Sequence, residues 1–122
     1  MVQENILFVD DEKSIQAICS RILKREGHSV DCANNGREAL DLLKTREYKL
    51  IISDLKMPEM NGQELLKIVK EKYPQINFMF ITAYATPETA KELIKDGAGE
   101  CLFKPFNIEE FIAKVRKCLA LK

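Results

Sequence analysis

The sequence lacks the features that would place a chain in a membrane or outside the cell. None of its apolar runs approaches the roughly 20 residues that a transmembrane helix needs. No basic stretch precedes the first apolar run, which starts at Ile6, so the N-terminal residues do not resemble a secretory signal. We therefore expect a cytoplasmic protein that does not associate with membranes.

An excess of charge of one sign is also missing, and so are closely spaced cysteines. Nineteen Lys and Arg residues balance nineteen Asp and Glu residues, which gives no reason to expect nucleic-acid binding through bulk charge. The four cysteines form no Cys-x-x-Cys pair, and the chain has one histidine. We therefore expect no disulfide and no zinc site, and we interpret the cysteines as small apolar residues in a reducing compartment.

What is present is the composition of an ordinary soluble globular protein. The chain has 122 residues, of which 46% are hydrophobic and 31% are charged, and this length is common for one domain. No linker, low-complexity tract or block of like charge interrupts it. The sequence therefore predicts a single domain over residues 1–122.

Short apolar runs alternate with longer amphipathic stretches along the chain. Continuous runs cover residues 6–9, 50–53, 77–81 and 101–103, and residues 28–33 alternate apolar and polar side chains. A stretch with helical periodicity follows each run. Such alternation predicts parallel βαβ units with right-handed crossovers.

The character of each run indicates its place in the sheet. Residues 6–9, 50–52 and 78–81 are apolar throughout, as buried central strands are. Residues 28–33 alternate and residues 101–103 are few, so both suit the edges. These observations predict an α/β fold of the flavodoxin-like (βα)5 type, a three-layer sandwich with a five-stranded parallel sheet in the order 2-1-3-4-5.

Local signals indicate where the helices begin and end. Thr86 is predicted to cap one helix and Asn107 the last one, with Glu110 at the capping-box position. The first helix is predicted to stop near Gly27. Its buried face is predicted to carry Ile15, Ile18, Ile22 and Leu23.

Four of the apolar runs lead directly into polar side chains. These are Asp10 and Asp11 after the first run, Asp54 after residues 50–53, Thr82 after residues 77–81, and Lys104 after residues 101–103. The carboxyl ends of parallel strands lie on one edge of the sheet, where ligands bind in open α/β folds. The predicted order also places the first and third strands side by side, which brings the three carboxylates together.

Three neighbouring carboxylates repel one another and raise each other's pKa. A hard divalent cation such as Mg²⁺ relieves the repulsion, and it keeps open positions for phosphoryl oxygens. Lys104 could then pair with a phosphate and Thr82 could donate a hydrogen bond to it. One carboxylate would be free to act as a nucleophile and form an aspartyl phosphate.

Taken alone, each of these residues has a simpler interpretation. An Asp after a strand is more often a helix N-cap than a ligand, Thr82 could be a turn residue, and Lys104 could be a solvated charge. Their joint occurrence at the ends of four strands favours the functional interpretation.

The polar strand ends stand in four longer segments: Phe8-Val9-Asp10-Asp11-Glu12, Asp54-Leu55-Lys56-Met57-Pro58 with Asn61-Gly62, Ile81-Thr82-Ala83, and Lys104-Pro105-Phe106. With these segments in this order, the sequence resembles the receiver domain of bacterial two-component response regulators over essentially its whole length. The resemblance implies a phosphorylation-activated signalling switch and not a turnover enzyme. Its partner would be a sensor histidine kinase or a phosphotransfer protein.

The resemblance also implies a role for each site residue. Asp54 would be the phosphoacceptor, and Thr82 and Lys104 would contact the phosphoryl group. Mg²⁺ would be bound directly by Asp11, Asp54 and the backbone carbonyl of Lys56, and through water by Asp10. The Lys104-Pro105 bond is expected to be cis, as it usually is in this family.

One position departs from the family pattern. Cys101 stands three residues before Lys104, where the family usually has Tyr or Phe as the aromatic part of its switch. Tyr84 does not replace it by position. We hypothesise instead that Tyr84 overhangs the site and, with Lys56, sets the lifetime of the phosphoryl group.

The signal is expected to leave through the surface around the fourth and fifth strands and the helices that follow them. Lys91, Lys95 and Lys114 are predicted to be exposed there, and each is also explained as part of a solvated helix surface. An output domain or a downstream protein, and a homodimer formed on phosphorylation, remain open.

Three other functions are compatible with the fold. A flavodoxin-like cofactor-binding domain would need a loop rich in Ser, Thr and Gly after the first strand, where this chain has Asp10-Asp11-Glu12. An aspartyl phosphatase would often have Asp-x-Asp there. A degenerate receiver used only for docking would lack some of the site residues, and all of them are present.

Overall fold

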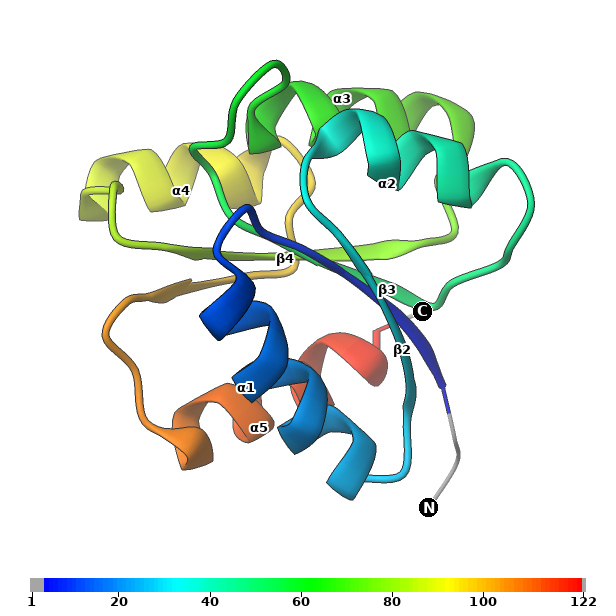
Figure 1. Cartoon of the computed structure of the whole chain (residues 1–122). Helices are drawn as coiled ribbons and strands as arrows, with labels where there is room; N and C mark the ends of the chain where they lie inside the picture. Colours follow the sequence, from blue (N-terminus) through cyan, green and yellow to red (C-terminus); the bar gives the residue numbers. More distant parts are fainter. Residues whose placement is uncertain (1–3, 122) are drawn as a thin grey trace.

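The computed structural model describes residues 4–121, which form five strands and five helices in alternation (Figure 1). The elements are β1 (Asn5–Val9), α1 (Lys13–Arg25), β2 (Ser29–Ala33), α2 (Gly36–Leu43), β3 (Leu50–Ser53), α3 (Gly62–Lys72), β4 (Asn77–Thr82), α4 (Pro87–Lys95), β5 (Glu100–Phe103) and α5 (Ile108–Leu119).

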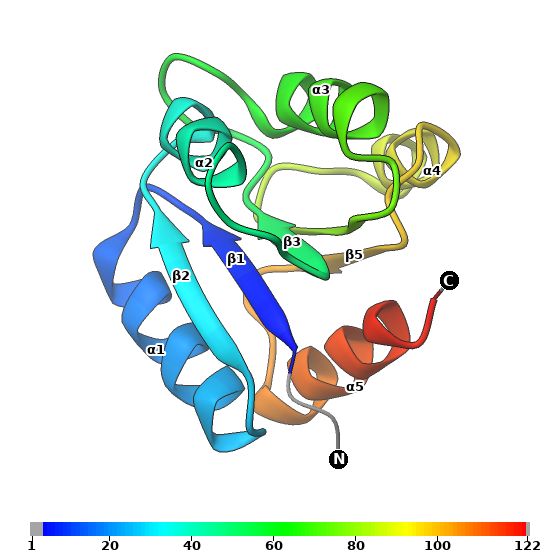
Figure 2. The ribbon, with the colours of Figure 1, turned by 90° about the vertical axis from the view of Figure 1, so that its right-hand side faces the viewer.

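The five strands form one parallel sheet in the order β2-β1-β3-β4-β5. Helices α2, α3 and α4 cover one face, and α1 and α5 cover the other (Figures 1 and 2). The predicted flavodoxin-like sandwich and its strand order are therefore confirmed. The three central strands β1, β3 and β4 are almost entirely buried. Their burial agrees with the apolar composition that predicted central positions for them and left the edges to β2 and β5.

The core has two halves, because successive residues of a strand point to opposite faces. Leu7 and Val9 pack toward α2, α3 and α4, whereas Ile6 and Phe8 pack toward α1 and α5. The predicted buried face of α1 is partly wrong. Ile18 is 54% exposed, and the buried residues of α1 are Gln16, Cys19, Ile22 and Leu23.

The predicted N-caps of helices α4 and α5 are confirmed. The side chain of Thr86 accepts a hydrogen bond from Thr89 N, and that of Asn107 accepts one from Glu110 N. A full capping box, which the sequence interpretation did not single out, links Asn61 and Glu64 at the start of α3. Gly27 has a φ of 94°, which suits the stop after α1.

Within residues 4–121, none of the helices has the length and apolarity that crossing a bilayer requires. The four cysteines are free, and Cys19, Cys101 and Cys118 are buried as expected. Cys32 is exposed and lies on the edge strand β2.

Candidate functional site

The carboxyl ends of β1 and β3 bring two buried carboxylates together. Asp10 and Asp54 directly follow these neighbouring strands and are only 1% and 4% exposed. Asp54 N donates to Val9 O at 2.9 Å, which continues the pairing of the two strands to the site itself. Carboxylate oxygens of Asp10, Asp54 and Glu12 lie within 4.8 Å of one another.

Lys104 brings a positive charge into this cluster of three acids. Its Nζ lies 3.0 Å from Asp10, 3.3 Å from Asp54 and 3.4 Å from Glu12. The peptide bond between Lys104 and Pro105 is cis, as expected, and Lys104 N donates to Thr82 O at 2.9 Å. The end of β5 therefore delivers one cation to the acids that β1 and β3 supply.

Burial and charge act in opposite directions on the ionisation of this cluster. Burial raises the pKa of Asp10, and the hydrogen bond from Glu12 N and the charge of Lys104 only partly offset this effect. Burial alone would lower the pKa of Lys104, but its hydrogen bonds and charge interactions with Asp10 and Asp54 outweigh burial and raise it. The ammonium is therefore held firmly in its charged form.

An open hollow lies over Asp54 and is bordered by Lys56 and Tyr84. Its other lining residues are Asp11, Glu12, Met57, Pro58 and Asn61. Lys56 Nζ lies 4.9 Å from the centre of the Tyr84 ring, within the range of a cation–π contact. This is the side from which a small molecule or a partner's side chain can reach the Asp54 carboxylate.

The predicted site residues are thus gathered at one sheet edge. Thr82 ends β4, is fully buried, and its hydroxyl accepts a hydrogen bond from Tyr84 N at 3.0 Å. Asp11 is exposed and lines the hollow, outside the cluster of three carboxylates. Glu12 takes part in that cluster although the sequence interpretation gave it no role. Its position as the third acid in the run after β1 was the available signal.

The loop after β3 holds Asp54 by close backbone packing. Leu55 N donates to Asp54 Oδ1 at 2.7 Å, and Gly62 N donates to Leu55 O at 2.7 Å. A Cβ at Gly62 would lie 2.4 Å from Asp54 O, closer than real Cβ atoms approach. Glycine is therefore required at this position for the loop to fold back against Asp54.

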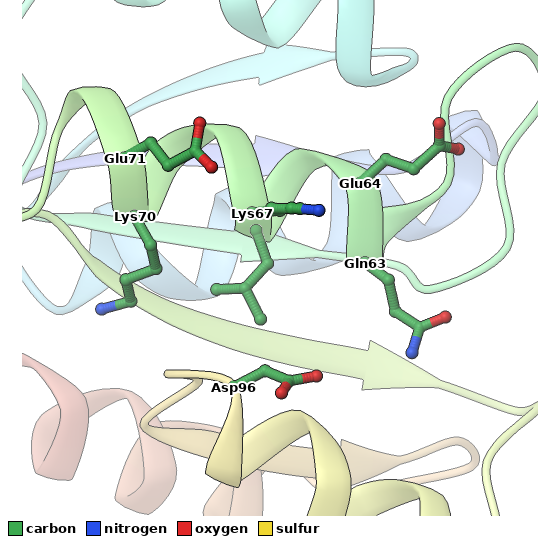
Figure 3. A pocket seen from close by; sticks show the side chains of 7 residues that line it. Gln63, Glu64, Lys67, Lys70, Glu71 and Asp96 are labelled. Carbon is green, nitrogen blue, oxygen red and sulfur yellow. The ribbon is translucent and has the colours of Figure 1, made fainter.

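A second hollow lies between α3 and the end of α4 and has a different character (Figure 3). Lys67 and Lys70 alternate there with acids of α3 and with Asp96. The charges are mixed, and no strand end contributes a residue to the lining. The sheet edge at Asp54 is therefore the better candidate for a chemical site.

Comparison with known proteins identifies the family to which the chain is similar. A family model described as the response regulator receiver domain matches residues 6–116. Sporulation initiation phosphotransferase F of Bacillus subtilis (strain 168) is 35% identical over 122 residues, which cover 100% of this chain and 98% of that protein. The solved chemotaxis response regulator CheY4 of Vibrio cholerae has a TM-score of 0.89 at 34% identity, covering 96% of this chain and 99% of that chain.

Other relatives are longer proteins. The transcriptional regulatory protein ZraR of Escherichia coli O157:H7 is 39% identical over 116 residues, which cover 95% of this chain but 26% of that protein. The chain spans about a quarter of the length of the first curated relatives that it matches.

Proposed function

This chain belongs to the response regulator receiver domain family, and from that membership we propose that it is a switch activated by phosphorylation of Asp54. Receiver domains act in two-component signalling and are not turnover enzymes. The phosphoryl group would come from a histidine kinase or a phosphotransfer protein. The observation that carries the proposal is the buried Asp54 carboxylate beside Asp10 and Lys104 under an open hollow. We further propose that residues 1–122 form a single receiver domain with a cytoplasmic location.

The donor set at this edge fits Mg²⁺. The cluster of Asp10, Glu12 and Asp54 offers carboxylate oxygens only, with Asp11 beside it, and hard divalent cations prefer such ligands. We propose that Asp11, Asp54 and the carbonyl of Lys56 hold the ion directly and that Asp10 holds it through water. When bound, the ion would neutralise charge on the transferring phosphoryl oxygens.

In the proposed transfer, a carboxylate oxygen of Asp54 forms a bond to phosphorus while the P–N bond of a phosphohistidine breaks. The electron pair of that bond leaves with the imidazole nitrogen, so no other reactant is needed. Lys104 is placed to pair with the phosphoryl group, because its Nζ already lies 3.3 Å from Asp54. Thr82 would have to turn its hydroxyl from Tyr84 N toward the phosphoryl group.

We also propose that the response reaches the surface formed by α4, β5 and α5, since Thr82 and Lys104 stand at the ends of β4 and β5. An output domain, a downstream protein or a second copy of the chain would contact it. Lys91 and Lys95 are exposed on α4. Lys114, which is expected to be exposed, is only partly so, because its side chain is 33% exposed and its Nζ forms an ion pair with Glu100 at 2.7 Å.

The test is exposure of the protein to acetyl phosphate with Mg²⁺, followed by intact mass measurement. We expect one phosphoryl adduct that requires Mg²⁺ and is lost in Asp54→Asn. Asp41→Asn is the matched control, because Asp41 is exposed on α2 and should leave the adduct intact. The absence of an adduct with acetyl phosphate, and with a range of phosphorylated histidine kinases, would contradict the proposal.

A further inference from the structure

Gln16 is a polar side chain on the buried face of α1. It is 7% exposed and takes a place where the helical pattern alone would put an apolar residue. Its Nε2 lies 2.5 Å from Asp10 O, 2.9 Å from Asn34 Oδ1 and 3.4 Å from Ala33 O. All three neighbours are acceptors, so the amide must present its N–H groups to them.

The contact with Asp10 O fixes the turn that carries the acids. Asp10 N already donates to Ala33 O at 3.1 Å. The Gln16 contact therefore fixes the carbonyl group of a residue whose amide group is already fixed. The peptide unit is planar, so fixing Asp10 O also fixes the direction in which the chain enters Asp11. The position of Asp11 and Glu12 relative to Asp54 therefore depends on Gln16.

Asn34, in the loop between β2 and α2, holds Gln16 in turn. Its Oδ1 accepts from Gln16 Nε2 and from Lys13 Nζ. Its backbone N and its Nδ2 each donate to Glu38 Oε1 at 3.0 Å. Glu38 thus sets the orientation of the Asn34 amide by accepting from its Nδ2. In that orientation Asn34 Oδ1 faces Gln16 and accepts from it.

We propose that Gln16, oriented by Asn34, is a positioning residue that sets the affinity of the acidic turn for Mg²⁺. This inference rests on the proposed function, because it concerns the same metal site. A purely structural role would predict a loss of folding stability with no change in metal affinity. A positioning role predicts a change in metal affinity in protein that is still folded, since outer contacts of metal sites typically alter affinity by about 10- to 100-fold.

The experiment compares wild type with Gln16→Met, which keeps the length of the side chain and removes its donors. Calorimetric titration with MgCl₂, without phosphodonor, should show affinity weakened by about tenfold. With acetyl phosphate, the Mg²⁺ concentration for half-maximal rate should rise equally, while the rate at saturating Mg²⁺ changes by less than about twofold. Gln63→Met is the control, because Gln63 is exposed on α3 and lines the second hollow (Figure 3) and not the hollow over Asp54.

A second variant keeps the test decisive if Gln16→Met does not fold. Asn34→Ala leaves Gln16 in place but removes the acceptor that orients it, together with the side-chain contacts to Lys13 and Glu38. It should therefore weaken Mg²⁺ binding in the same direction. The double variant should bind no more weakly than Gln16→Met, because both changes act through one contact. Unchanged Mg²⁺ affinity in a folded Gln16→Met, or in Asn34→Ala, would overturn the inference. Failure of wild type itself to bind Mg²⁺ would instead overturn the proposed metal site.

Discussion

Lys104 is the residue on which the charge balance of the site depends. Its Nζ contacts Asp10, Asp54 and Glu12 while the side chain is only 13% exposed. Breaking a buried ion pair by removing one partner leaves the other charge uncompensated. Lys104 therefore serves the fold, by offsetting repulsion among the acids, and the same charge is what a phosphoryl group on Asp54 would meet.

Tyr84 is the residue expected to control access of water to a phosphorylated Asp54. The residue is 62% exposed, and its ring contacts Lys56 at the border of the hollow. We expect Tyr84→Ala to shorten the lifetime of the phosphoryl group by roughly two- to fivefold, the factor that corresponds to one exposed cation–π contact. The measurement is the decay of the phosphorylated protein after removal of the phosphodonor, followed by intact mass.

Tyr84→Phe is the matched variant, since it keeps the ring over the hollow and should leave the lifetime near that of wild type. An unchanged decay rate in Tyr84→Ala would show that the ring does not shield Asp54.

At the scale of elements, helix α1 shows what the sequence could and could not predict. Apolar periodicity correctly predicted that Ile22 and Leu23 are buried. It wrongly predicted that Ile18 is buried, and it did not predict the burial of Gln16. The actual face is rotated because Gln16 is held by Asp10 O and Asn34, a contact between segments far apart in the sequence. Local signals predict caps and strand order well, whereas the roles of Gln16 and Glu12 depend on tertiary placement.

Glu100 joins strand β5 to helix α5. Its carboxylate lies 2.7 Å from Lys114 Nζ and 2.9 Å from Lys117 Nζ. Burial by itself raises the pKa of Glu100, but the hydrogen bonds and charges of the two lysines outweigh burial and lower it. Because the folded-state pKa is lowered, this stabilisation is present above the unfolded-state pKa of about 4.3 and is lost as pH falls through the folded-state pKa.

We therefore expect Glu100→Gln to reduce the free energy of unfolding at pH 7 by on the order of 1 kcal/mol. The difference from wild type should shrink toward zero as the pH falls below about 4, because the glutamic acid is then neutral as well. Urea unfolding at several pH values measures it. Glu109→Gln, an exposed position on α5, should show no such pH dependence, and a difference independent of pH would contradict the assignment.

At the scale of the whole molecule, the sheet concentrates its polar chemistry at one edge and its apolar packing elsewhere. The central strands are buried on both faces by helices. The apolar core therefore stabilises the fold against the repulsion among the carboxylates at the edge. At that edge the ammonium of Lys104 contacts three carboxylates. The fold therefore tolerates an acidic cluster that a cation would stabilise further.

Mg²⁺ should accordingly raise the melting temperature of the protein, because a ligand that binds only the folded state stabilises it by mass action. At a Mg²⁺ concentration ten times the dissociation constant, the gain is about 1.4 kcal/mol, or roughly 4 to 7 °C for a domain of this size. Thermal unfolding followed by circular dichroism, with EDTA and then with MgCl₂ at matched ionic strength, measures the shift. Asp54→Asn should lose most of the shift, whereas Asp41→Asn should keep it. An equal shift in Asp54→Asn would place the bound ion away from the acidic edge.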